Sequence, residues 1–281
     1  MSLSRLPRVE AIHLLRQVDA ELIPLLRSLE SEEWQKPAVG HWVVRDVAAH
    51  LLDGALRRLS LDRDGHRPPA TSHDLGQYSE LVDFLNGLNA TWVEATQRLS
   101  PQVITDLLEI VNPAVADYLE SLDPEGEAAF LVSWAGESAT RVWMDIAREF
   151  TERWHHQQQI REAVGAPWLA DRHYVEALLA TFVRALPRSY GEVDAREGAT
   201  LLIEITDFDG LSWVLERRAN EWQLGPQTAE AEPDASIRLF SETAWRLFIK
   251  GIGPEAARKA ATISGDERLT RPFFDTLAVM A

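Results

Sequence analysis

Cysteine is absent from all 281 residues of the chain. This excludes disulfides, thiolate metal sites and a cysteine nucleophile, so any thiol chemistry needs a thiol supplied by a cofactor or substrate. Long apolar runs are also missing, and none approaches the ~18 residues of a membrane-spanning helix. The N-terminal stretch MSLSRLPRVEAIHLL lacks the apolar core and small-residue cleavage site of a signal peptide. We therefore expect a cytoplasmic protein without a membrane partner.

Cations are scarce: 28 Lys and Arg stand against 44 Asp and Glu, which gives a formal net charge of −16. Nucleic-acid binding requires clustered cations, so nucleic acid is not expected as a partner. A few local arginines could still bind a small anionic substrate. The hydrophobic content of 46% and charged content of 26% are typical of a folded globular chain. At this length a single core tends to divide into two domains.

The first part of the chain has the apolar spacing of helices. The expected helices cover residues 8–30, 43–62, 74–99, 101–123 and 138–163. Asp74 could cap the third helix, Pro113 is expected to interrupt the fourth, and Ser138 starts the last. Gly165 and Pro167 form a stop signal for that last helix. These features predict a helical domain over residues 1–165, most simply a four-helix bundle.

The pattern changes after Trp168. Residues 171–187 still read as helix, and Ser241 can cap another helix over 242–250. Strands are expected at 199–206, 211–217, 221–224 and 235–240. Two more short helices are expected within 255–280, around a short apolar stretch at 261–264. Strands mixed with peripheral helices predict a smaller α+β domain over residues 166–281.

Four metal-ligand candidates lie within the helical stretch 148–160, REFTERWHHQQQI: Glu149, Glu152, His155 and His156. Glu152 and His156 are four residues apart, which places both on one face of a helix. His155 follows Glu152 at three residues and competes as a ligand.

A third ligand has to come from elsewhere in the chain, and His50 is the histidine that lies in the middle of a predicted bundle helix. A half-buried histidine bonded to a neighbour would explain it equally well. His41 sits beside Trp42 and could be near a site. The four remaining histidines are interpreted as surface residues, namely His13, His66, His73 and His173.

Two short motifs carry a family resemblance. Residues 42–51, WVVRDVAAHL, resemble the tryptophan-x-valine-arginine-aspartate stretch, ending in histidine-leucine, of the mycothiol-dependent maleylpyruvate isomerase family. That family belongs to the DinB-like group of metal-binding four-helix bundles. Residues 148–156 are similar to its later arginine-x-x-x-glutamate-x-tryptophan-x-histidine helix. Residues 199–280 resemble its smaller sterol-carrier-protein-like domain.

The resemblance implies the metal ligands His50, Glu152 and His156, and its motif favours His156 over His155. Arg148 and Glu149 could orient these ligands through hydrogen bonds, or could be exposed helix charges. Two imidazoles and a carboxylate suit a divalent ion and leave a fourth position open, as in catalytic sites. Zinc is the favoured ion, with nickel, manganese and iron as alternatives.

In the family, a low-molecular-weight thiol such as mycothiol uses the open position. A metal lowers the pKa of a bound thiol. The thiolate could add to an electron-poor double bond, allow rotation and leave again, which is cis–trans isomerisation; it could instead displace a leaving group. The expected protein is thus a thiol-dependent isomerase or transferase whose partners are a small-molecule substrate and the thiol.

The sequence also departs from the family pattern. Val43 stands where a serine or threonine often caps the helix, and Lys250 lies near the position of a family arginine. Arg238, Arg246 and Arg258 are further anion-contact candidates. The alternative function is a non-catalytic protein that binds metal or carries an apolar ligand. Monomer and homodimer both remain open.

Overall fold

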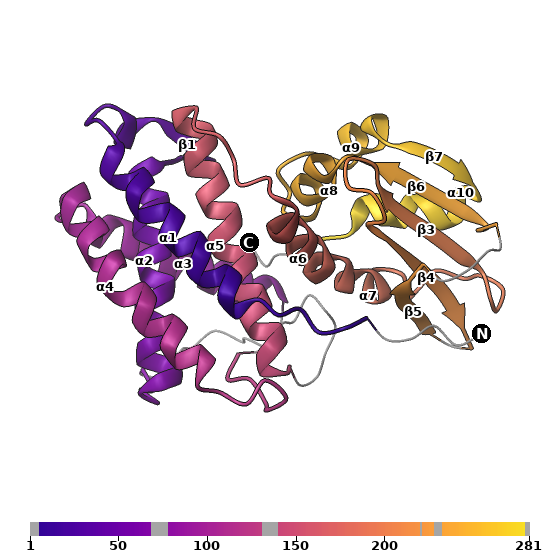
Figure 1. Ribbon diagram of the computed structural model, residues 1–281, viewed down its shortest axis with the longest axis horizontal. Coiled ribbons are helices and arrows are strands. Elements are labelled where there is room, and N and C mark those ends of the chain that lie inside the picture. Colours follow the sequence, from indigo (N-terminus) through magenta and orange to yellow (C-terminus); the bar gives the residue numbers. More distant parts are fainter. Residues whose placement is uncertain (1–5, 69–77, 131–139, 220, 228–231, 279–281) are drawn as a thin grey trace. The chain divides into compact units, whose positions relative to one another are not determined.

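The computed structural model describes residues 6–68, 78–130, 140–219, 221–227 and 232–278 (Figure 1). The chain divides into two compact units. One contains the described residues of 10–129 and 141–170, and the other contains mainly those of 171–278. Residues 166–170 thus group with the helical unit, and the domain boundary at residue 165 stays a prediction. No helix among the described residues is long and apolar enough to cross a membrane.

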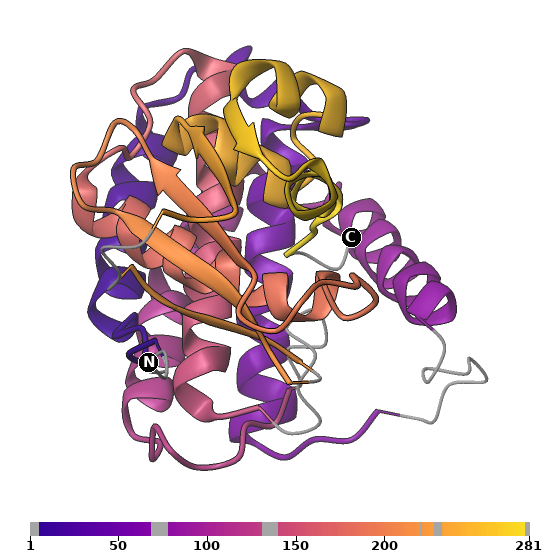
Figure 2. The same cartoon turned by 90° about the vertical axis from the view of Figure 1, so that its right-hand side faces the viewer.

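Four helices form the core of the first unit: α1 (Ile12–Ser28), α2 (Val44–Arg57), α4 (Pro101–Glu120) and α5 (Val142–Val164). Helices α1 and α2 each pack against both α4 and α5, which confirms the predicted four-helix bundle. Helix α3 (Tyr78–Thr96) packs on α2 and lies at the edge of the bundle (Figure 2). A π-helical turn, η2 (Arg58–Arg63), extends α2.

One local prediction for this unit was wrong. Pro113 does not interrupt α4, which continues from Pro101 to Glu120. An interior proline costs a helix about 3 kcal/mol, and here burial of Ile104, Leu108 and Val115 on the same helix outweighs that cost. The connection before α2 contains short elements of its own. It contains the turn η1 (Glu33–Gln35) and a hairpin of β1 (Pro37–Val39) and β2 (Trp42–Val43). Asp74 and Ser138, the predicted helix starts, lie outside the described residues.

The second unit is built on a five-stranded sheet, which confirms the smaller α+β architecture. Its strands are β3 (Thr200–Ile205), β4 (Ser212–Arg218), β5 (Glu221–Pro226), β6 (Ala235–Leu239) and β7 (Thr262–Gly265). Their order is β5-β4-β3-β6-β7. The β3–β6 pair is parallel, with Leu201 opposite Ala235, and the other pairs are antiparallel.

Helices and turns supply the rest of this unit. They are α6 (Arg172–Phe182), η4 (Val183–Ala185), α7 (Leu186–Ser189), α8 (Ser241–Phe248), α9 (Pro254–Ala260), α10 (Glu267–Thr270) and η5 (Arg271–Asp275). Alternate residues of β3 are buried, as expected for a sheet with one covered face. Aromatic rings pack together between α6, α8 and η5: Phe248 lies 5.9 Å from Phe182 and 5.7 Å from Phe273, measured between ring centroids.

Two details of the second unit also differ from the sequence prediction. The short apolar stretch at 261–264, for which no strand was predicted, contributes the edge strand β7, which pairs with β6. Ser241 is the first residue of α8 and not its cap. Its hydroxyl instead donates to Asp207 Oδ2 at 2.6 Å, which ties α8 to the end of β3.

A network of buried charges surrounds α5 at the centre of the bundle. Arg58 donates to both oxygens of Asp145, at 2.6 and 3.0 Å, and to Glu149 Oε2 at 3.1 Å. Arg153 donates to Glu149 Oε1 at 3.1 Å and to Asp19 of α1. The side chains of Arg58, Asp145 and Arg153 are at most 6% exposed. The network therefore joins α1, α5 and the residue that follows α2, and the side chains of Glu149 and Asp19 are 10% and 11% exposed.

We expect Gly265 to be irreplaceable in β7. Its φ is +83°, and an added Cβ would lie 2.1 Å from the carbonyl oxygen of Asp234. Gly210 has a similar φ of +75° but open space around it. Gly265→Ala should lower the free energy of unfolding by about 3 kcal/mol or more, from left-handed strain plus overpacking. Gly210→Ala should cost about 1–2 kcal/mol from strain alone. Urea unfolding measures both, and equal losses would contradict the steric argument.

Removal of one charge from the network should be costly. Burial raises the pKa of Glu149, but Arg58, Arg153 and Arg148 outweigh it and hold that pKa at about 2. We expect Glu149→Gln to lower the free energy of unfolding at pH 7 by about 3–5 kcal/mol, because the buried Arg58 and Arg153 each lose one of their carboxylate partners. The matched variant Glu120→Gln breaks an exposed pair with Arg16 and should cost less than about 1 kcal/mol.

The loss in Glu149→Gln should also depend on pH. A carboxyl with a depressed folded-state pKa contributes stability that is present above its ordinary pKa and is lost as the pH falls toward its folded-state pKa. The difference between wild type and Glu149→Gln should therefore be constant above about pH 4.5 and shrink as the pH falls toward 2. Unfolding curves at several pH values test this. A difference that grows on acidification would refute the assigned direction.

Candidate metal centre

The first motif places α2 through contacts of its own side chains. The backbone N–H of Val43 donates to Asp46 Oδ2 at 3.2 Å, so Asp46 stabilises the helix start although Val43 has no capping hydroxyl. The buried Arg45 donates to the backbone carbonyls of Thr96 and Leu99 at the end of α3. Arg45 and Asp46 thus have structural roles, and the histidine of the motif is free for another one.

His50 lies on α2 and faces α5. Its ring centroid is 4.7 Å from that of His156, with the two rings nearly perpendicular. The ring of Trp42, held by the β1–β2 hairpin, lies 5.1 Å from His50 on α2. The Nδ1 atom of His50 is buried and has no hydrogen-bond partner in the described part of the protein. Buried polar atoms are normally hydrogen-bonded, so this nitrogen is a candidate to bind an ion or a ligand.

Helix α5 supplies the other side chains of this cluster. Glu152 Oε2 lies 3.6 Å from His156 Nε2, and the Glu152 side chain is 31% exposed. His155 Nδ1 is 3.0 Å from the carbonyl oxygen of Thr151, and His156 Nδ1 is 2.8 Å from Gln159 Oε1. One potential ligand atom from each of Glu152, His155 and His156 lies within 4.8 Å of the others.

The environment sets the charge of these groups. Burial, together with the neighbouring His156, lowers the pKa of His50 to about 3. Burial and His156 likewise lower the pKa of His155 to about 4. Burial would raise the pKa of Glu152, but the nearby His156, His155 and Arg148 hold it below its ordinary range. At neutral pH the cluster therefore offers uncharged imidazoles at His50 and His155 and an ionised carboxylate, the forms that bind metals.

The structure places the predicted site residues in two groups. The His50 ring lies beside the ring of His156, which in turn lies beside Glu152, and the ligand set itself stays a prediction. The described ligand atoms that lie within 4.8 Å of one another belong to Glu152, His155 and His156, and His50 is not in that group. Arg148 and Glu149 belong instead to the buried charge network. Arg148 donates to Asp145 at 3.1 Å, and Glu149 accepts from Arg58 and Arg153. Neither forms a hydrogen bond with Glu152 or His156 among the described contacts, and Arg148 acts on the Glu152 carboxylate through its charge.

Sequence reasoning missed two neighbours of this cluster. Trp42 was noted only as part of a motif, and its contact with His50 depends on a hairpin that no apolar spacing indicates. Gln159 had a usable signal, because it follows His156 by three residues on a helix and so shares its face. His13, His41, His66 and His173 are exposed, in agreement with the surface interpretation for three of them, and His73 lies outside the described residues.

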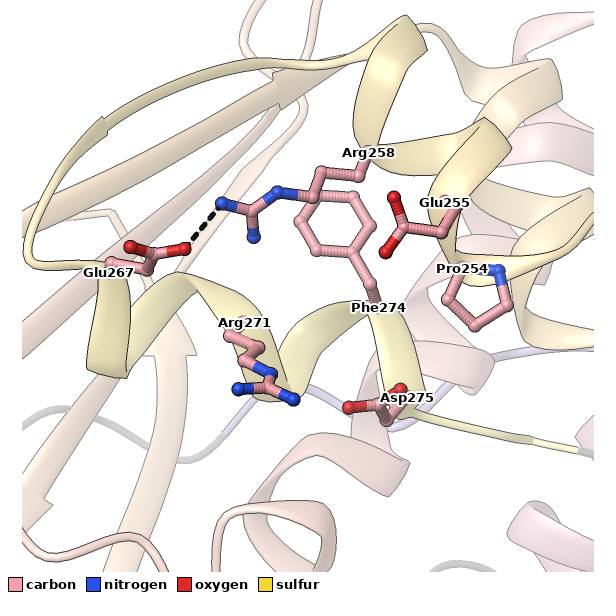
Figure 3. Close-up of a pocket in the computed structure, with 7 residues that line it drawn as sticks. All are labelled: Pro254, Glu255, Arg258, Glu267, Arg271, Phe274 and Asp275. Carbon is pink, nitrogen blue, oxygen red and sulfur yellow. Dashed lines mark hydrogen bonds and ion pairs between the residues drawn. The ribbon is translucent and has the colours of Figure 1, made fainter.

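The second unit contains a shallow cavity of about 280 Å³ beside α9 and η5 (Figure 3). Its wall is mostly charged and includes Glu255, Arg258, Glu267, Arg271 and Asp275. Arg258 pairs with Glu267 at 2.8 Å. Arg238 pairs with Glu204 at 2.8 Å and Arg246 with Glu242 at 3.0 Å. The three predicted anion contacts are thus already bound to carboxylates, and the cavity has no apolar character suited to a lipid.

Comparisons with known proteins bear on both units. The family model for the mycothiol maleylpyruvate isomerase N-terminal domain matches residues 15–161. A crystal structure of the mycothiol-dependent maleylpyruvate isomerase is similar over 92% of this chain and 93% of that chain, with a TM-score of 0.54 and 14% identity. A histidine-to-alanine mutant of it gives the same coverage and TM-score at 13% identity. No curated protein matches the chain.

A third solved structure, the ubiquinone synthesis protein UbiJ-SCP2, covers 38% of this chain and 87% of its own, with 17% identity and a TM-score of 0.27. That score is too low to establish a shared fold. The two maleylpyruvate isomerase structures, by contrast, extend over both units and support the same overall architecture.

Proposed function

Because the chain belongs to the mycothiol maleylpyruvate isomerase N-terminal domain family, we propose that it is an enzyme that uses a divalent metal and a low-molecular-weight thiol. The reaction is cis–trans isomerisation, or thiol transfer, on a small electrophilic substrate. The observation that supports this proposal is the approach of the His50 ring on α2 to the His156 ring on α5, which lies beside Glu152, although the two motifs are about a hundred residues apart.

The donor set fits a divalent ion. A metal requires deprotonated carboxylate and neutral imidazole, which are the forms that the surroundings favour for Glu152 and His50. The orphaned Nδ1 of His50 supports the fit, because a buried ring in an apolar core would otherwise be satisfied by a neighbour. Two imidazoles and one carboxylate leave a position open to solvent or to a ligand. Zinc matches this set best, and nickel, manganese and iron remain alternatives.

The metal and the thiol would supply one part of the chemistry, and the residues of the chain supply the other. A bound divalent ion would lower the pKa of a coordinated thiol and so supply a thiolate at neutral pH. The chain itself has no cysteine to provide that nucleophile. Its residues position the donors, and the Trp42 ring covers one side of His50 and limits access of water there. Arg148, 23% exposed, keeps positive charge near Glu152 and favours the ionised carboxylate.

The alternative role as a carrier of apolar ligands has no specific observation in its favour. The interior of the second unit is filled by buried Phe182, Tyr190, Phe248 and Phe273 side chains. The cavity found there is lined by charged residues.

Metal analysis tests the proposal directly. We expect about one divalent ion per chain after loading and dialysis, and a loss of most of it in His50→Ala, Glu152→Gln and His156→Ala, because each removes one of three donors. His13→Ala and His173→Ala, which change exposed histidines, should bind as wild type does. His155→Ala should also retain the ion. Equal metal content in all variants and wild type would contradict the assigned site.

The activity is tested with the loaded enzyme, mycothiol and maleylpyruvate, and the conversion of the cis into the trans double bond is followed by absorbance. A second assay uses small electrophiles that carry a leaving group. Displacement of that group by mycothiol indicates a transferase, and conversion of maleylpyruvate indicates an isomerase. We expect turnover only with both metal and thiol present and a decrease of at least about 100-fold in His156→Ala, since donor loss removes the ion. Metal-bound protein that turns over none of these substrates would limit the proposal to binding.

A further inference from the structure

Gln159 makes a contact that neither the motif nor the donor set requires. It lies three residues after His156 on α5, and its Oε1 is 2.8 Å from His156 Nδ1. A carboxamide oxygen can only accept a hydrogen bond, so Nδ1 must be the donor and must carry the ring hydrogen. A neutral imidazole has one N–H, and Nε2 is then left with its lone pair.

That lone pair points to the proposed centre. His156 Nε2 is the ring atom that lies 3.6 Å from Glu152 Oε2. We propose that Gln159 is a positioning residue that selects the Nδ1–H form of His156 and fixes the ring with Nε2 toward the metal. This inference rests on the proposed function for its metal, but the hydrogen location can be measured without one.

Among the described contacts, Gln159 Oε1 is the acceptor within hydrogen-bond distance of Nδ1, whereas Glu152 Oε2 lies 3.6 Å from the other ring nitrogen. The His156 side chain is only 12% exposed, so water competes weakly for Nδ1. His50 and His155 restrict tilting of the ring, at centroid distances of 4.7 and 3.9 Å, but offer no hydrogen-bond acceptor to Nδ1 in the described contacts. Ligand histidines generally hold their other ring nitrogen in a bond to a carboxylate, carbonyl or water, and loss of such a bond weakens metal binding about 10- to 100-fold.

His155 provides an internal reference. Its Nδ1 lies 3.0 Å from the backbone carbonyl oxygen of Thr151, which also accepts only. The same ring form is therefore expected at His155, but its origin is the helix backbone and not Gln159. A variant at Gln159 should change His156 and leave His155 as it was.

The test uses two variants of the full chain. Gln159→Leu removes the acceptor at similar volume, and Gln159→Glu keeps an acceptor in place. Imidazole ¹⁵N chemical shifts of the metal-free protein, recorded above the ordinary histidine pKa, report which nitrogen carries the hydrogen. We expect Nδ1–H at His156 in wild type and Gln159→Glu, and a mixture of both forms in Gln159→Leu. The His155 signals should be unchanged in all three.

Zinc affinity, measured by competition with a chelator, gives the second readout. Gln159→Leu should bind about 10- to 100-fold more weakly, and Gln159→Glu at least as tightly as wild type. Hydrogen on Nε2 of His156 in the wild type would overturn the inference. It would also be overturned if Gln159→Leu changed neither the ring form nor the zinc affinity. A Gln159→Leu variant that binds zinc more weakly but keeps the Nδ1–H form would overturn it as well. If Gln159→Leu does not fold, the inference is tested by the wild-type ring form and by the zinc affinity of Gln159→Glu. Hydrogen on Nε2 in the wild type, or weaker zinc binding by Gln159→Glu, would then refute it. Wild type with Nδ1–H but no zinc binding would refute the proposed function and leave the ring assignment standing.

Discussion

The bundle depends on the paired charges around α5. Helix α5 is the central element of its unit, yet it has many charged and polar residues, and Glu149, Arg153 and Asp145 are buried. Unpaired, each would cost several kcal/mol to remove from water. They are tolerated there because Arg58 and Asp19 arrive from the neighbouring helices with the opposite charge. Attraction and desolvation roughly cancel in such pairs, so their main consequence is geometric.

That geometry reaches the candidate metal centre. Arg58 follows His50 by eight residues, and Glu149 precedes His156 by seven. At 1.5 Å per residue these separations are about 12 and 10 Å along their helices. Contact between Arg58 and Glu149 therefore fixes where α2 lies along α5, and it brings His50 opposite His156. The charge network and the ligand cluster thus lie at two different positions along the same pair of helices.

The two motifs also divide their residues between fold and site. In the first motif, Arg45 holds the end of α3 and Asp46 holds the start of α2, while His50 faces the cluster. In the second, Trp154 is fully buried and donates to the carbonyl oxygen of Leu169, while Glu152 and His156 keep partial exposure. Some residues of each motif therefore fix the position of a helix, and the others supply the side chains of the candidate site.

The sequence alone determined the helical bundle and the α+β unit, since apolar spacing and turn residues are local properties. Residue spacing also placed Glu152 and His156 on one face of a helix. It did not determine that His50 lies against them, for which the family resemblance was needed. Only the tertiary structure decided the partners of Glu149, the hairpin contact of Trp42 and the continuity of α4 through Pro113. These depend on pairings between segments far apart in the chain, whose energies outweigh local preference and leave no periodic trace in the sequence.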